Sequence, residues 1–69
     1  MIRNDDLMIE VYRNFIKSFH GHLSVDDIGG IFMAQEFEKI DAIKATDESK
    51  SRLKDYIEEV VIMVNSEVK

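Results

Sequence analysis

The chain has 69 residues and carries 14 acidic against nine basic side chains, a net charge of −5, with no cysteine, proline or tryptophan. This length allows one domain with a small core, and the lack of cysteine excludes disulfides and thiolate metal sites. Apolar residues make up 45% of the chain, which is typical of a folded domain rather than a disordered one.

The first predicted helix covers residues 5–19. Asn4 is the expected N-cap, and Asp5 and Asp6 suit the positive end of the helix dipole. Gly21 is the expected C-terminal stop, in the left-handed conformation. Helical spacing places an apolar stripe on one face, formed by Met8, Val11, Tyr12, Phe15, Ile16 and Phe19.

The second predicted helix covers residues 24–44, with Ser24 as its N-cap. Gly29 and Gly30 interrupt the helical pattern, and two interpretations are open: the helix breaks there, or another helix approaches closely. The apolar face after the glycines consists of Phe32, Met33, Phe37, Ile40 and Ile43. We place Phe37 in the core and expect Phe37→Ala to unfold the chain.

The third predicted helix covers residues 47–66 and is capped by Thr46. Its heptad-like seam, flanked by Tyr56, Val61 and Val68, consists of Leu53, Ile57, Val60 and Val64. Residues 60–64 are rich in β-branched side chains, so a strand is the alternative, but a lone strand has no pairing partner in so helical a chain. The expected fold is all-α: one domain over residues 1–69, either a small three-helix bundle or a helical hairpin with a short extra helix.

The C-terminal half of the third helix predicts self-association. At 100° per residue, Ile62 lies almost opposite Leu53 and Met63 lies on one flank, so residues 60–64 are apolar around nearly the whole circumference. The other two helices are short, and we do not expect them to cover both sides of this segment. We therefore expect a two-fold dimer through this segment, which Ile62→Glu would disrupt. The alternative is a single exposed Ile62, which is ordinary on protein surfaces.

The sequence His20-Gly21-His22 is the candidate metal site, because alternate histidines can bind one ion. A stable site needs a third or fourth ligand, and no H-E-x-x-H spacing provides one. We therefore predict no metal and no cofactor, and expect both histidines to lie in a turn.

Glu36 falls within the apolar arc of the second helix, between Ile40 and Ile43 on the wheel. A carboxylate buried there could act as an acid, a base or a partner contact. The alternative is a rim position from which Glu36 reaches solvent or pairs with Lys39, three residues later, or with an arginine on another helix.

Residues 23–32 resemble the first helix of a helix-turn-helix motif, with a small residue after Ile28. The resemblance covers about fifteen residues and implies a DNA-binding regulator. Met33 occupies the position at which the motif usually has its turn glycine. The segment that would be the recognition helix, residues 34–39, contains Glu36 and Glu38 but no arginine. Two carboxylates there would repel phosphates, so this interpretation is only an alternative.

No nucleophile elbow, phosphate-binding loop or catalytic pair is visible, so we predict that the protein is not an enzyme. The longest apolar run, residues 60–64, is far shorter than the ~20 residues of a membrane span, and residues 1–6 do not resemble a signal peptide. We expect a cytoplasmic adaptor, inhibitor or regulator that binds another protein, with no membrane contact. An acidic mimic of nucleic acid is a further alternative. The expected partner-binding residues are Met33, Glu36, Ile62 and Met63.

Overall fold

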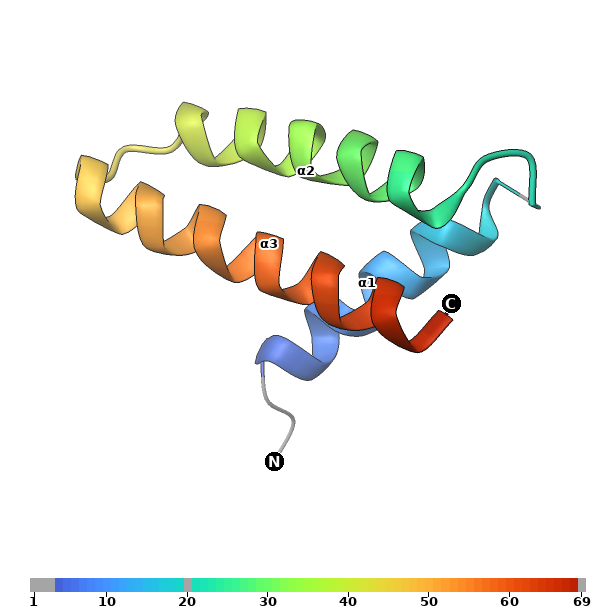
Figure 1. The fold of residues 1–69 in the computed structure, drawn as a ribbon. Coiled ribbons are helices and arrows are strands. Elements are labelled where there is room, and N and C mark those ends of the chain that lie inside the picture. The colour runs from blue at the N-terminus through green and yellow to red at the C-terminus, as the bar shows by residue number, and fades with distance from the viewer. Residues whose placement is uncertain (1–3, 20, 69) are drawn as a thin grey trace.

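A computed structural model describes residues 4–19 and 21–68, with side chains from residue 7 onward. These residues form three helices: α1 (Asn4–Lys17), α2 (Val25–Ala42) and α3 (Asp47–Val68). Figure 1 shows α2 and α3 side by side as an antiparallel hairpin, with α1 lying against α3 near the open end of that hairpin. The prediction of an all-α fold is confirmed. The strand alternative for residues 60–64 is wrong, since they lie within α3.

Side chains at the predicted caps define where α2 and α3 begin. The Asp27 amide donates to the Ser24 hydroxyl oxygen at 3.2 Å, and the Ser49 amide donates to that of Thr46 at 3.1 Å. Both N-caps are therefore confirmed. Gly21 has a φ of 81°, the left-handed conformation predicted for it. The side chain of the predicted cap at Asn4 lies outside the described residues.

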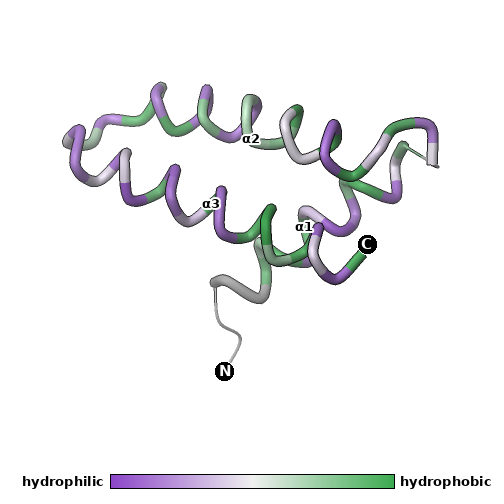
Figure 2. The backbone as a smooth tube through the Cα atoms, in the orientation of Figure 1, coloured by the Kyte–Doolittle hydropathy of each residue, from purple (hydrophilic) through white to green (hydrophobic). Residues whose placement is uncertain are grey.

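The core lies where the three helices meet, and Figure 2 shows the apolar residues of α3 gathered in its C-terminal half. The stripe of α1 contributes the fully buried Tyr12, while the other ring residues of the stripe are partly buried. Ile28 and Val61 were not expected in the core. The buried apolar residues are Tyr12, Ile28, Phe32, Ile40, Ile57, Val60, Val61 and Val64.

Three residues expected on core faces are exposed instead. Val11 lies at the edge of the α1 stripe, and Ile43 lies just beyond the end of α2. Leu53 lies in the N-terminal half of α3, and its side chain is exposed at the edge of a surface hollow described below. These expectations were wrong because a helical wheel identifies a face but does not show how far a neighbouring helix covers it.

Gly29 lies within the continuous helix α2, at a point where α1 and α3 pack against its backbone. A Cβ atom at this position would lie 2.8 Å from Val61 Cγ1 and 3.0 Å from the Tyr12 hydroxyl oxygen. The missing side chain lets α3 and α1 approach the backbone of α2. Of the two interpretations that the sequence left open, the break at residues 29–30 is wrong, and the close approach of another helix is confirmed.

One buried polar group connects all three helices. The Tyr12 hydroxyl donates to Asn65 Oδ1 at 2.6 Å, and Asn65 Nδ2 donates to the Val25 carbonyl at 3.2 Å. Asn65 is only 8% exposed, so these bonds replace the water that its amide loses on folding. The arrangement fixes the position of α1 across α2 and α3.

Because the Tyr12 hydroxyl is buried, we expect the stability of the protein to depend on pH in the alkaline range. Burial raises its pKa above the ordinary value of 10.0, and the charge of Asp26 adds to the rise. Because the folded-state pKa exceeds the unfolded one, this group's contribution to stability is complete below pH 10.0 and is lost as the pH rises through the folded-state pKa. We expect Tyr12→Phe to lower the free energy of unfolding by about 1 kcal/mol at pH 7. The difference in this free energy between the variant and wild type should become smaller in strong alkali.

Urea denaturation of both proteins from neutral pH to pH 11 measures this difference. The lysines titrate over the same range in both proteins, so their effect cancels in the comparison. A difference that stays constant up to pH 11 would contradict the burial of this hydroxyl.

Candidate partner-binding groove

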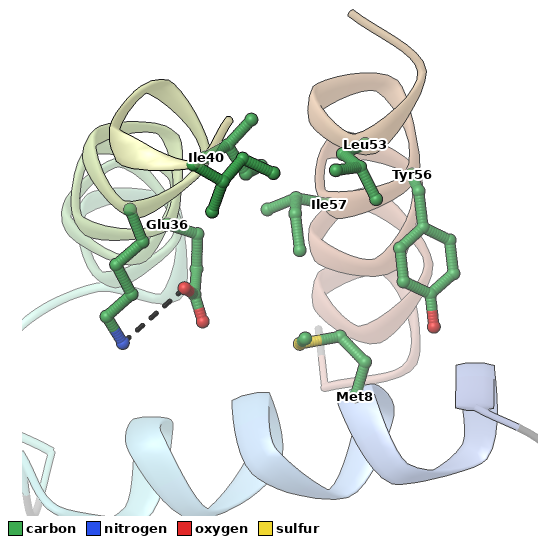
Figure 3. Close-up of a pocket in the computed structure, with 8 residues that line it drawn as sticks. Met8, Glu36, Ile40, Leu53, Tyr56 and Ile57 are labelled. Atoms are coloured by element: carbon green, nitrogen blue, oxygen red, sulfur yellow. Dashed lines mark ion pairs between the residues drawn. The ribbon is translucent and has the colours of Figure 1, made fainter. Parts of the chain in front are cut away.

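A groove opens between the C-terminal half of α2 and the N-terminal half of α3, with α1 at one end of it. Its volume is about 220 Å³. Figure 3 shows Met8 reaching up from α1 between the other two helices, with Ile40 and Ile57 facing one another across the groove. The lining residues are Met8, Glu36, Lys39, Ile40, Ile43, Leu53, Tyr56 and Ile57.

The walls of the groove are apolar and its rim is accessible. Ile40 and Ile57 are buried and belong to the core of the domain. Ile43 and Leu53 line the same groove, yet their side chains remain 45% and 41% exposed. The groove is therefore continuous with the core but leaves apolar surface in contact with water.

Glu36 and Lys39 supply the charged groups of the groove. Lys39 Nζ lies 3.5 Å from a Glu36 carboxylate oxygen, and the exposed fractions of the two side chains are 75% and 14%. The sequence alternative of a Glu36–Lys39 pair is confirmed. Because Lys39 extends into water, the pair contributes little to stability, and the Glu36 carboxylate is largely shielded from solvent.

The four predicted partner-binding residues do not lie together. Glu36 lines the groove, whereas Met33 packs partly buried against the core. Ile62 is 61% exposed on the outer face of α3, in a shallow hollow that it shares with Asp55, Glu58 and Glu59. Met63 is also exposed, and it is not among the residues that line the groove.

Sequence reasoning missed most of the groove. Ile43 and Leu53 were identified as apolar, but both were assigned to the core. Tyr56 was noted only as a flank of the α3 seam, and Met8 only as part of the α1 stripe. The available signal was the difference in predicted length between the first helix and the two that follow it, because a shorter helix cannot cover the whole of a longer hairpin.

Neither of the other two candidate sites is present in full among the described residues. α2 is continuous from Val25 to Ala42, so the turn that a helix-turn-helix requires at Met33 is absent. Among the described residues, no three histidine or acidic side chains are grouped closely enough to bind a metal ion. His22 follows the turn at Gly21, while His20 lies outside the described residues.

Comparisons with protein-family models, with curated proteins and with solved structures found no match to this chain. Within the described part of the chain, no helix is both long and apolar enough to cross a membrane. What the protein does must therefore be inferred from its own geometry, of which the groove is the most specific feature.

Proposed function

We propose that this protein acts by binding another protein chain, and that the groove between α2 and α3 receives an apolar side chain from an amphipathic helix. The observation that supports the proposal is an apolar hollow with two exposed aliphatic residues, Ile43 and Leu53, at its rim. Helix-in-groove binding uses this combination of a concave apolar surface and a charged edge.

The size and chemistry of the groove favour a side chain over a small-molecule substrate. Its volume of about 220 Å³ is below the ~300 Å³ at which ligand pockets usually begin. Its charged lining groups, Glu36 and Lys39, form an ion pair with each other, as side chains with a structural role commonly do. We therefore propose a regulator, adaptor or inhibitor without a catalytic step, acting in the cytoplasm.

Two exposed aliphatic residues of α3 provide a matched test. Leu53 lines the groove, whereas Ile62 lies outside it among carboxylates. Peptides are selected from a display library of amphipathic helices, and their affinities for wild type and both glutamate variants are measured by fluorescence anisotropy. We expect Leu53→Glu to weaken binding roughly tenfold or more, because it places a carboxylate at an apolar contact. Ile62→Glu should leave the affinity essentially unchanged.

Circular dichroism establishes that both variants keep the helical content of wild type. Peptides that bind all three proteins equally would show that the groove is not the binding surface. A loss of peptide affinity that occurs only in Ile62→Glu would show that the binding site is the outer face of α3.

A further inference from the structure

The groove has room for one aromatic ring. Its volume is about 220 Å³, and an engineered apolar cavity of about 150 Å³ in another protein is large enough to bind benzene. The groove is also open to solvent, since Ile43 and Leu53 at its rim are exposed. A ring can therefore enter while it stays attached to the helix that carries it. A leucine side chain has fewer carbon atoms and would leave part of the apolar wall without contacts.

The lining of the groove also favours a ring. Ile40 and Ile57 face one another across the groove and belong to the core, so these two walls are fixed in position. Met8 reaches between the other two helices from α1, and it is the lining residue that α1 contributes within the described part of the chain. A thioether sulfur makes favourable contacts about 5 Å from an aromatic ring, and the unbranched side chain adjusts to its neighbours. An aromatic occupant therefore gains a contact that an aliphatic one lacks.

The accessible charge at the edge of the groove is positive. The side chain of Lys39 is 75% exposed, whereas that of Glu36 is 14% exposed. Lys39 Nζ lies 3.5 Å from a Glu36 carboxylate oxygen, which is longer than the roughly 2.7–2.9 Å of a charge-assisted hydrogen bond. The ammonium group therefore keeps its hydrogens available for a second carboxylate. Residues three or four apart lie on the same face of a helix, so a partner helix can present a ring to the groove and an acid to Lys39 together.

We infer that the groove binds the ring of a phenylalanine on the partner helix, and that Lys39 pairs with an acidic residue one helical turn from that phenylalanine. The inference rests on the proposed function, since it names the side chains by which the partner helix is recognised. Apolar contact holds the ring in the groove, and the charge of Lys39 selects the register in which the helix lies.

Sequencing the helical peptides selected from the display library tests the inference without a known partner. We expect the peptides whose binding depends on Leu53 to carry a phenylalanine at the position where alanine causes the largest loss of affinity. An aspartate or glutamate should lie three or four residues from it. Replacing that phenylalanine with leucine should weaken binding roughly tenfold, since small changes in the fit of an apolar side chain have effects of this size. Peptides that converge on leucine, isoleucine or tryptophan at this position would overturn the inference.

Methionine methyl NMR locates the ring on the protein. The methionine methyl groups are labelled with carbon-13, and the Met8 signal is assigned by its loss in Met8→Leu. A ring bound against Met8 changes the chemical shift of this methyl group through its ring current, so the phenylalanine peptide should shift the signal further than the leucine peptide. Met33 and Met63 do not line the groove and serve as internal controls. A ring-dependent shift at either control and not at Met8 would contradict the location.

A charge exchange tests the role of Lys39. Lys39→Glu should weaken binding of the acid-bearing peptide roughly fivefold, because repulsion replaces an ion pair at the surface. A peptide with lysine in place of its acid should recover the lost affinity. Lys44→Glu is the matched control, because it makes the same change of charge at an exposed residue outside the groove. Equal losses in the two variants, or no recovery with the exchanged peptide, would contradict the pairing with Lys39.

The identity of the anchoring side chain and the proposed function fail separately in these experiments. If the selected peptides depend on Leu53 but are anchored by an aliphatic side chain, the inference is wrong and the binding groove stands. If no peptide binds in a Leu53-dependent manner, the groove is not a binding surface, and both the inference and the proposed function are wrong.

Discussion

Phe32→Ala is expected to lower the free energy of unfolding by about 3–5 kcal/mol, the usual cost of removing a buried ring. Phe32 is 3% exposed, and its ring centroid lies 4.7 Å from that of Tyr12 and 5.2 Å from that of Phe15. It is therefore the residue of α2 on which the rings of α1 pack. In so small a domain this loss approaches the whole stability, and the variant should be largely unfolded at room temperature.

Phe37 is the matched control, because it lies on the same helix and loses the same atoms. The apolar pattern of the sequence predicts Phe37 in the core, but in the structure it is partly buried, with Lys54 Nζ 5.7 Å from the ring centroid. Phe37→Ala should therefore cost clearly less than Phe32→Ala and leave a folded protein. Urea denaturation followed by circular dichroism compares the two variants. Equal losses would show that α1 does not pack on Phe32 as described.

Local signals in the sequence were sufficient to predict the helices. Ser24 and Thr46 begin α2 and α3 as predicted, because a hydroxyl that accepts from a free amide is a short-range interaction. The first helix ends at Lys17 rather than at residue 19, and the third extends to Val68 rather than to residue 66. Such small differences are expected where the last turn of a helix frays.

The packing of the three helices could not be predicted from the same signals. Leu53 belongs to the seam of α3 and is exposed, whereas Val61 flanks that seam and is 3% exposed. The difference comes from Gly29, which lets α2 approach α3 at Val61. Asn65 was missed as well, although it lies one turn after Val61, where a polar residue within an apolar face often fixes the register of neighbouring helices.

The groove follows from a difference in length between the helices. α1 has 14 residues and α3 has 22, which correspond to about 21 and 33 Å at 1.5 Å per residue. A helix as short as α1 leaves part of the hairpin uncovered, and the predicted helix lengths already contained this information. Which half remains uncovered depends on the contacts of Tyr12 with Phe32 and Asn65, and these join residues far apart in the sequence.

Gly29→Ala is expected to destabilise the protein by about 1–3 kcal/mol, the usual cost of overfilling a packed core. The added Cβ would lie 2.8 Å from Val61 Cγ1 and 3.0 Å from both Asn65 Nδ2 and the Tyr12 hydroxyl oxygen. All three side chains are buried, and two of them are hydrogen-bonded to each other. None can move aside freely, so α2 must shift away from α3 and the bond between Tyr12 and Asn65 must lengthen.

Gly30→Ala is the control, and its effect should have the opposite sign. Gly30 is exposed within α2, and a Cβ there would meet nothing within 4 Å. Alanine in place of glycine inside an exposed helical turn stabilises by about 0.5–1 kcal/mol, because the unfolded chain loses conformational freedom. Urea denaturation of the two single variants measures both effects. If both substitutions stabilise the protein, α2 and α3 do not approach one another at Gly29, and the buried contact of Tyr12 with Asn65 would have to be placed differently.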